Sequence, residues 1–289
     1  MGKKILITGV NGYIGRQLAW YLDKEGHEVS GYDIHIGKDL KPLLKATKYE
    51  DVVDVHFDAV VHLAAVSSVP AFNDDPINSL IHSLNALYDA LQIKTDKFVF
   101  ASSAAVTVLP SKRSDYGRMK SLCEDILSKH CKSPFAVLRF HNVAGCIPKS
   151  GFVENHEPET HLIPNMVLNK SLTIYGDGSQ IRDYVHVEDV CRAVEEACLD
   201  KDETPLWTEV GTGIGSSVID VIRTYNEVTG STIAIEFLGE RTGDVDSLVS
   251  YPPDGDTISL YTIIQDTICG YAQKGQKSEM LEKEVNGWI

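Results

Sequence analysis

The first half of the chain alternates short apolar runs with stretches of helical periodicity. Five runs have the length of a strand: residues 3–9, 27–33, 58–65, 97–103 and 133–140. Between the first two, residues 16–26 (RQLAWYLDKEG) place apolar side chains at helical spacing and end on a glycine. Apolar strands separated by helices indicate a parallel sheet with helices on both faces. The pattern therefore predicts an α/β fold of the doubly wound, Rossmann type.

The pattern changes after the fifth run. Residues 145–164 (GCIPKSGFVENHEPETHLIP) are rich in Gly, Pro, Asn and Glu, and predict a long loop rather than another strand–helix unit. The tail, residues 273–289, is polar and could form a frayed helix. We therefore expect one domain over residues 1–145, rejoined by about residues 183–212, and a smaller domain over residues 146–289.

Composition restricts the partners and the compartment. A net charge of −14 over 289 residues argues against binding to nucleic acid, because the phosphates would meet a like-charged surface. No apolar stretch approaches the length of a membrane span, and the N-terminal apolar run is too short for a signal peptide. Six scattered cysteines without a CxxC pair indicate free thiols rather than disulfides or a metal site. We expect a cytoplasmic protein with no bound metal.

Three glycines after the first strand predict a dinucleotide-binding turn. Gly9, Gly12 and Gly15 follow a strand and open a helix, where bare backbone and unpaired N–H groups favour a pyrophosphate. Asp33 ends the second predicted strand, where a carboxylate accepts hydrogen bonds from an adenosine ribose and repels the 2′-phosphate of NADP. The alternative is that the glycines are ordinary turn formers and Asp33 is a solvated strand end. Together the two features favour NAD.

A serine pair and a Tyr–Lys pair supply the candidate chemistry. Ser102 and Ser103 end the fourth predicted strand, at the edge of a parallel sheet where ligands bind. Tyr116 and Lys120 follow, at a spacing that puts both side chains on one face of a helix. A nearby lysine and the oxidised nicotinamide favour the phenolate of a tyrosine that is otherwise a poor base, and Ser103 can orient the reacting hydroxyl. We prefer Ser103 to Ser102, and an exposed helical pair is the alternative for Tyr116 and Lys120.

Several motifs now resemble a known family. Taken in chain order, TGVNGYIG, DAVVHLAA, SSAAV, YGRMK and LRFHNVAG resemble the extended short-chain dehydrogenase/reductase family. Three later segments, NHEPETHLIPNMV, LTIYGDGSQIRDYVHVEDV and ERTGDV, resemble its GalE-like UDP-glucose 4-epimerases. The resemblance covers most of residues 4–268. It implies a first domain that binds NAD and a second that binds a nucleotide sugar.

The resemblance also implies roles for individual residues. The implied catalytic residues are Tyr116 as base, Lys120 as the residue that tunes it and binds the nicotinamide ribose, and Ser103 as their partner. The cofactor site would comprise Gly9, Gly12, Tyr13, Ile14, Gly15, Asp33, Leu63, Ala64, Ala65, Tyr116 and Lys120. The substrate site would comprise Ser103, Asn142, His161, Leu162, Tyr175, Arg182, Arg241 and Asp244.

Within the substrate site, the resemblance gives each part of the nucleotide sugar its own residues. Asn142 would face the nucleotide sugar, and Tyr175 would lie beside the uracil, where an aromatic ring can stack. His161 and Leu162 would contact the diphosphate and uridine through their loop. Arg182 would hold the diphosphate and the uridine ribose together with Arg241 and Asp244.

The implied activity is the NAD-dependent interconversion of UDP-glucose and UDP-galactose through a 4-keto intermediate, in a homodimer that pairs through the helices around 78–92 and from Tyr116 onward. Alternatives are an epimerase of UDP-N-acetylglucosamine or UDP-glucuronate, a decarboxylase, or a non-catalytic NAD-binding module. A 4,6-dehydratase is disfavoured because SSAAV, residues 102–106, lacks the acid of the TDE motif in similar dehydratases.

Three departures from the resembled family leave details open. The segment between Asp33 and Asp58, part of which usually lies against adenine, is shorter than usual, and the loop between Ser103 and Tyr116, which bears on the approach to Tyr116, is shorter as well. The segment that usually follows Asp244 is missing, and Leu248 occupies a position that tunes sugar size in the family.

Overall fold

A computed structural model describes residues 2–34, 40, 43–45, 47–67, 69–154, 161–169, 171–239 and 245–274. The chain separates into two compact units that are each built from discontinuous segments. Unit 1 comprises residues 1–140 and 191–210, and unit 2 comprises residues 141–190 and 211–289.

Unit 1 is built on a parallel sheet of six strands in the order β2-β1-β3-β4-β5-β9. The strands are β1 (Lys4–Thr8), β2 (Glu28–Tyr32), β3 (His56–His62), β4 (Lys94–Ser103), β5 (Phe135–Phe140) and β9 (Leu206–Val210). The first five correspond to the five apolar runs of the sequence, which confirms the predicted α/β fold class. Residues 5–8 of β1 are completely buried, as expected for a strand covered on both faces.

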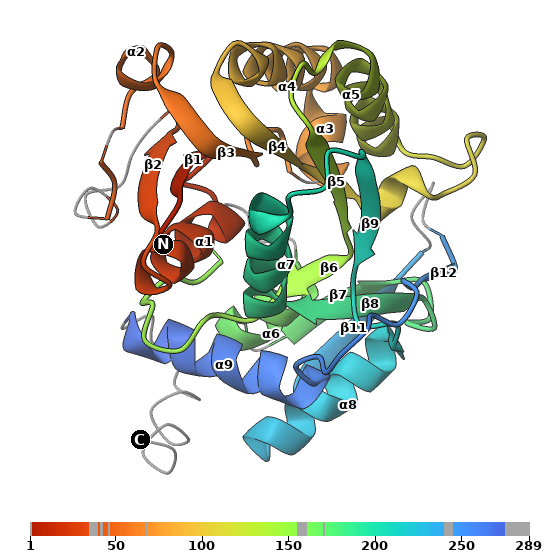
Figure 1. Cartoon of the computed structure of the whole chain (residues 1–289). Helices are drawn as coiled ribbons and strands as arrows, with labels where there is room; N and C mark the ends of the chain where they lie inside the picture. The colour runs from red at the N-terminus through yellow and green to blue at the C-terminus, as the bar shows by residue number, and fades with distance from the viewer. Residues whose placement is uncertain are drawn as a thin grey trace. The chain divides into compact units, whose positions relative to one another are not determined.

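Helices cover both faces of this sheet. They are α1 (Tyr13–Lys24), α3 (Val69–Asp74), α4 (Pro76–Leu91), α5 (Asp115–His130) and α7 (Val187–Leu199), with the short α2 (Tyr49–Val52) and a 3₁₀ helix, η1 (Ala104–Val106). The strand order runs in opposite directions from β1 to β2 and from β3 to β4. Because such crossovers are right-handed, α1 lies on one face and α4 and α5 on the other (Figure 1).

Two hydrogen bonds to Glu195 attach α7 to the face that carries α1. Tyr21 and His27 reach its two carboxylate oxygens at 3.0 and 2.9 Å. The strand order reverses beside β1, and ligands of open α/β sheets bind at the carboxyl ends of the strands near such a reversal. In unit 1, a ligand site is therefore expected at the residues that follow β1, β2 and β4.

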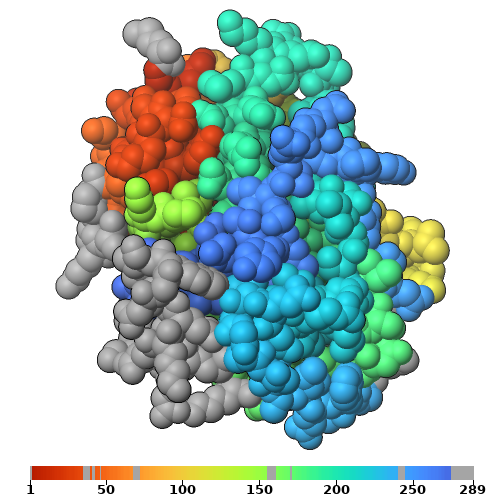
Figure 2. All heavy atoms as spheres, turned by 90° about the horizontal axis from the view of Figure 1, so that it is seen from below, coloured from red at the N-terminus to blue at the C-terminus, as the bar shows by residue number. Residues whose placement is uncertain are grey.

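Unit 2 combines two small sheets with three helices. One sheet contains β6 (Asn142–Ala144), β8 (Ile181–His186), β10 (Gly215–Ser217) and β12 (Ser247–Leu248), all paired to β8, and the other pairs β7 (Ser171–Tyr175) with β11 (Ala234–Leu238). The helices are α6 (Leu162–Leu168), α8 (Val218–Thr229) and α9 (Leu260–Gln273). Helices α8 and α9 pack on each other, and Figure 2 shows their cyan and blue surfaces side by side.

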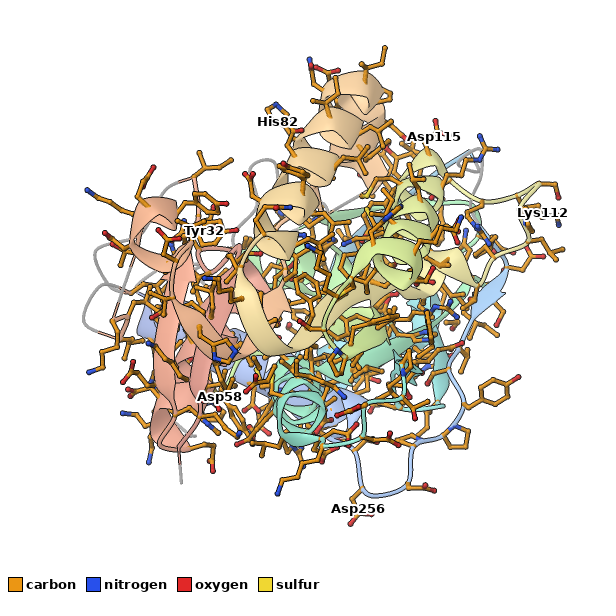
Figure 3. The ribbon with its side chains drawn as sticks, turned by 45° about the horizontal axis from the view of Figure 1, so that its top comes forward. Tyr32, Asp58, His82, Lys112, Asp115 and Asp256 are labelled. Atoms are coloured by element: carbon orange, nitrogen blue, oxygen red, sulfur yellow. The ribbon has the colours of Figure 1, made fainter. Side chains whose placement is uncertain are left out.

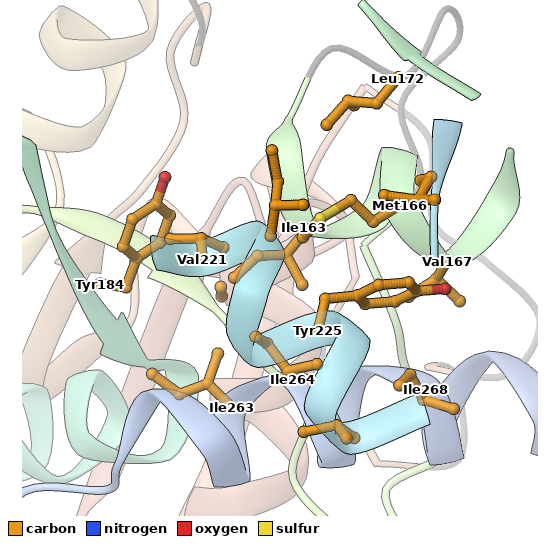
Figure 4. Close-up of a cluster of buried hydrophobic side chains, with 14 of the residues drawn as sticks. Ile163, Met166, Val167, Leu172, Tyr184, Val221, Tyr225, Ile263, Ile264 and Ile268 are labelled. Carbon is orange, nitrogen blue, oxygen red and sulfur yellow. The ribbon is translucent and has the colours of Figure 1, made fainter. Parts of the chain in front are cut away.

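The core of unit 2 lies among these helices and the sheet edge. Ile163 and Met166 of α6, Tyr225 of α8, and Ile263 and Ile264 of α9 are buried together (Figure 4). Each helix contributes one apolar stripe, and none of the three could bury that stripe alone. The expected long loop is present in part, since the structure describes no helix or strand between β6 and residue 154. Residues 155–160 and 275–289 lie outside the described part of the chain.

Candidate active site

The glycine turn after β1 has the geometry that a dinucleotide site requires. Gly9 has a φ of +70°, and a Cβ there would lie 2.7 Å from the backbone nitrogen of Ala64. A Cβ on Gly15 would lie 2.4 Å from the carbonyl oxygen of Gly9. Gly12 is the residue before α1 and has no side chain to cap that helix. The turn therefore packs tightly against the neighbouring backbone. Because Gly12 has no side chain, it does not cover the N–H groups at the start of α1.

Asp33 braces this turn from the end of β2. One carboxylate oxygen accepts the N–H of Asn11 at 2.9 Å, and the other accepts the N–H of Ile34 at 2.7 Å. Each carboxylate oxygen can accept a second hydrogen bond, so Asp33 retains capacity for hydroxyl groups of a ligand. The side chain thus fixes the turn and still offers acceptors.

A hollow of about 410 Å³ opens beside Asp33. Its lining comprises Tyr32, Asp33, Ile34, Thr47, Lys48, Tyr49 and Glu50. Tyr32 and Tyr49 stack edge to face, with ring centroids 5.5 Å apart. The hydroxyl of Tyr32, which is labelled in Figure 3, is buried and makes no hydrogen bond to the described residues. The segment between Asp33 and Asp58, short as it is, therefore still forms a cavity with aromatic walls.

Ser103, Tyr116 and Lys120 lie close together at the carboxyl end of β4. Ser103 lies within hydrogen-bonding reach of Tyr116, and the Oγ of Ser103 accepts the N–H of Ala105 at 3.2 Å. Because that N–H occupies an acceptor site of Ser103, the Ser103 hydroxyl hydrogen can be directed at Tyr116. Lys120 donates from Nζ to the carbonyl oxygen of Ala101 at 2.8 Å, and its ammonium lies 5.2 Å from the centre of the Phe100 ring.

Burial dominates the acid–base properties of this cluster. Burial raises the pKa of Tyr116 to about 12, against the lowering effect of its hydrogen bond with Ser103. Burial also lowers the pKa of Lys120 to about 8, against the raising effects of Cys123 and Glu124. A protonated Tyr116 and a charged Lys120 therefore coexist at neutral pH, and a further positive charge beside Tyr116 would be needed to favour its phenolate.

Local contacts position the start of α5. The Ser114 side chain caps the helix by accepting the N–H of Gly117 at 3.2 Å. Arg113 donates to the carbonyl oxygens of Val106 and Val108, and so holds the short loop after η1 against the helix start. Lys112 marks the outer part of this loop in Figure 3. The loop before Tyr116 is short, and these contacts fix it.

Ser102 has different surroundings from Ser103. It is buried, and its hydroxyl donates to Glu124 at 2.5 Å. The geometry thus brings Ser103, and not Ser102, to Tyr116.

Ser103 lies in unit 1, and the other predicted substrate residues that the structure describes lie in unit 2. Asn142 is exposed on β6, Tyr175 ends β7, and Leu162 begins α6 and packs against the core. His161 precedes α6 and pairs through Nδ1 with the buried carboxylate of Glu154.

Arg182 lies on β8, where one nitrogen donates to the carbonyl oxygens of Ile181 and Val245 at 2.9 and 2.8 Å. Leu248 of β12 is its register partner. Arg241 and Asp244 lie outside the described residues.

Three comparisons place the chain among known proteins. The model of the NAD dependent epimerase/dehydratase family matches residues 5–206. The chain belongs to this family. It is 33% identical to a UDP-glucose 4-epimerase of Halalkalibacterium halodurans, over 88% of this chain and 89% of the relative. It is 31% identical to a UDP-glucose 4-epimerase of Lactobacillus helveticus, over 86% of this chain and 88% of the relative.

A solved structure gives the same result. UDP-glucose 4-epimerase from Brucella ovis, in complex with NAD, superposes with a TM-score of 0.81 at 25% identity, covering 91% of this chain and 96% of that chain. Family membership confirms the Rossmann-type fold, NAD as the cofactor and the prediction of an enzyme of the epimerase family.

Two buried polar residues that the sequence does not single out, Asp183 on β8 and His62 on β3, connect their strands to neighbouring segments by hydrogen bonds. Asp183 accepts hydrogen bonds from the backbone N–H and hydroxyl groups of Thr212 and Ser250, and from the N–H of Gly213. His62 shares a 2.7 Å hydrogen bond with the hydroxyl of Thr8, next to the glycine turn. A polar residue inside an apolar run is the signal for such positions, because a buried polar group requires a partner.

The described residues show no sign of a metal centre or of a membrane span. Within them, no group of three or more His, Cys, Asp and Glu side chains could hold a metal ion. None of the helices in the described ranges combines the length and the apolar character needed to cross a bilayer.

Proposed function

We propose that this protein is an NAD-dependent 4-epimerase that interconverts UDP-glucose and UDP-galactose. The observation that carries the proposal is the proximity of Ser103 to Tyr116, one helical turn from the charged Lys120. The curated relatives named UDP-glucose 4-epimerase support the choice of reaction.

The residues present fit NAD. The turn at Gly9 and Gly12 leaves space for a pyrophosphate against the start of α1. We assign the hollow beside Asp33 to the adenosine, with Tyr32 and Tyr49 as its aromatic walls and Asp33 as acceptor for the ribose hydroxyls. Bound in this way, NAD would supply a reversible hydride acceptor for C4 of the sugar.

The protein's own groups would move and hold the proton. The positive charge of a bound oxidised nicotinamide would favour the phenolate of Tyr116, and the Oη of that phenolate would take the proton of the 4-hydroxyl when the sugar is oxidised and return it afterwards. The single hydroxyl hydrogen of Ser103 would favour the phenolate of Tyr116, and it could turn to the reacting oxygen of the sugar once Tyr116 has taken the proton. Lys120 keeps a positive charge in the buried site, where a charge has a large effect on the phenolate.

We propose that unit 2 binds the nucleotide part of the substrate. We assign Tyr175 to the uracil, Arg182 to the diphosphate, and His161 with Leu162 to the loop contacts that the family resemblance implies; Asn142 would face the sugar. Arg241 and Asp244 complete the proposed set from outside the described residues. Binding energy taken from the nucleotide allows the hexose ring to be held loosely enough to turn.

Other UDP-sugars are the second candidate for the substrate. Leu248 is paired with Arg182 between β12 and β8. The residue at the position that tunes sugar size in the family therefore lies next to the arginine that we assign to the diphosphate. An apolar side chain of this size leaves UDP-N-acetylglucosamine and UDP-glucuronate as substrates to be tested beside UDP-glucose.

The proposed setting is the cytoplasm, in galactose metabolism. All six cysteines are free thiols in the structure, and four of them are buried. Free thiols persist in a reducing compartment, which supports this location.

We further propose a homodimer that pairs through α4 and α5. Ile77, Ile81 and Tyr88 lie along one side of α4, with Ile77 73% and Tyr88 64% exposed, and Leu122 of α5 is exposed as well. Large apolar side chains at helical spacing on a surface favour a protein partner over water.

The mutation Tyr116→Phe tests the proposed chemistry. It removes the hydroxyl that carries the proton, so kcat for UDP-galactose should fall by about 100-fold or more while UDP binding is retained. The measurement is turnover with UDP-galactose, UDP-N-acetylgalactosamine and UDP-galacturonate side by side, with UDP affinity by calorimetry.

Tyr261→Phe is the matched control, because Tyr261 is an exposed tyrosine on α9. Its rate should equal that of the parent. Conversion of none of the three substrates by the parent would remove the epimerase proposal, and an unimpaired Tyr116→Phe variant would remove the role of Tyr116.

A further inference from the structure

The carboxylate of Glu124 is buried one helical turn beyond Lys120 on α5. Glu124 follows Lys120 by four residues and Tyr116 by eight, so all three side chains lie on one face of α5. Ser102 donates to Oε1 of Glu124 at 2.5 Å, and Arg139 donates to both of its oxygens at 3.0 and 2.7 Å. The Glu124 side chain is only 8% exposed.

These contacts join three elements at one point. Ser102 is the penultimate residue of β4, and Arg139 lies opposite it on β5 in the register of the sheet. The bidentate Arg139–Glu124 pair fixes the direction of the carboxylate as well as its position. Since Ser103 follows Ser102 directly, the distance between α5 and the strand end that carries Ser103 depends on the same carboxylate.

The same carboxylate also supplies charge near Lys120. The groups that face Lys120 are Cys123 and Glu124 on its own helix and His62 on β3, whereas β4 offers only the carbonyl of Ala101 and the ring of Phe100. Burial keeps His62 neutral by lowering its pKa to about 3. Glu124 is therefore the one carboxylate among these groups that raises the pKa of Lys120, which burial has lowered to about 8.

We propose that Glu124 is a positioning residue for the reaction: it fixes α5 against the end of β4 so that Tyr116 meets Ser103, and it holds a negative charge one turn beyond Lys120. The inference rests on the proposed epimerase function. It adds a structural requirement that the Ser–Tyr–Lys set alone does not contain.

Glu124→Gln tests both parts, because glutamine keeps the shape and removes the charge. The expected result is a kcat lower by roughly 10- to 100-fold with KM within about twofold of the parent, since misplacement of a catalytic group acts on turnover. Without the carboxylate Lys120 loses its proton at lower pH, so the alkaline limb of the kcat profile should move down by roughly one pH unit. Turnover is measured on the full chain with NAD between pH 6 and 10.

A second variant separates position from charge. Ser102→Ala removes one donor to Glu124 and leaves the carboxylate paired with Arg139, so kcat should fall by roughly 3- to 10-fold with an unchanged alkaline limb. The matched control is Glu195→Gln, a second largely buried acid of unit 1 with two side-chain partners, Tyr21 and His27. His27 precedes β2, at the amino ends of the strands and therefore away from Ser103.

The outcomes distinguish this inference from the function on which it rests. A parent without turnover of any UDP-sugar contradicts the proposed function. An active parent together with parent-like kcat and pH profiles in both Glu124→Gln and Ser102→Ala overturns the role of Glu124. A loss of kcat that Glu195→Gln reproduces to the same extent also overturns it, because removal of any buried acid would then suffice. If Glu124→Gln does not fold, the kcat of Ser102→Ala alone decides whether Glu124 is a positioning residue.

Discussion

At the scale of single residues, buried polar groups with several partners define the local geometry. Asp183 is completely buried and receives hydrogen bonds from two segments of unit 2 that are distant in the chain, Thr212–Gly213 and Ser250. A Cβ on Gly211 would lie 2.5 Å from its carboxylate, so the surrounding backbone is packed against it. These hydrogen bonds lower the pKa of Asp183 below its ordinary value, even though burial acts in the opposite direction.

Asp183→Asn should therefore destabilise the protein. Asparagine cannot accept all the hydrogen bonds that converge on Asp183, so we expect the free energy of unfolding at neutral pH to fall by about 2–4 kcal/mol. Because the pKa of Asp183 is lowered by folding, its stabilisation is complete above the ordinary pKa of an aspartate and is lost as pH falls through the folded value. The difference from the parent should thus shrink below about pH 4.

Urea denaturation at pH 7 and at acid pH measures this effect. Asp256→Asn, at an exposed position labelled in Figure 3, is the control and should unfold like the parent. Equal stability of Asp183→Asn and parent at pH 7 would contradict the assignment of Asp183 as a buried structural acceptor.

Residue-level sequence reasoning reaches only part of the site. Gly9, Asp33 and the Tyr116–Lys120 pair could be predicted because each follows from local spacing beside a strand or on a helix. The preference for Ser103 over Ser102 has a weaker basis in the sequence, because neighbouring strand residues point to opposite faces and a shift of one residue would exchange them. Glu124 could not be predicted, because its partners Ser102 and Arg139 lie 22 and 15 residues away.

At the scale of elements, burial explains which strands the sequence reveals. Strands β1 to β5 are apolar runs because the sheet is covered on both faces. Strand β9 is an edge strand whose Leu206, Trp207 and Thr208 are exposed, so its sequence carries little signal and it was not predicted. The small sheets of unit 2 were also missed, since β6, β10 and β12 have only two or three residues each.

The exposed side of α4 should mediate self-association. The double variant Ile77→Glu/Ile81→Glu places two charges on this apolar surface. It should therefore convert the dimer into a monomer of 31.9 kDa. Sedimentation equilibrium measures the mass. Ile214→Glu, at an exposed isoleucine of unit 2, should leave the mass unchanged. A monomeric parent, or a double variant that remains dimeric, would contradict pairing through α4.

At the scale of the whole molecule, bound cofactor should contribute to stability. NAD at 100 times its Kd would stabilise the native state by about 2.7 kcal/mol, which corresponds to a rise in Tm of about 5 °C or more. NADP at the same concentration should produce a smaller shift, because Asp33 lies where the 2′-phosphate would bind. Differential scanning calorimetry without substrate measures both. Equal shifts would contradict the role of Asp33, and the absence of any shift with NAD would contradict the assigned cofactor site.

The discontinuous construction of the two units has a consequence for biosynthesis. The sheet of unit 1 lacks its last strand until residue 210 has left the ribosome, by which time residues 141–190 of unit 2 already exist. A nascent chain that stops at residue 140 would leave β5 as an open strand edge and the buried ammonium of Lys97 without Asp200. Neither unit can thus be completed before the other has begun, so no single cut in the gene separates the two units with all their segments.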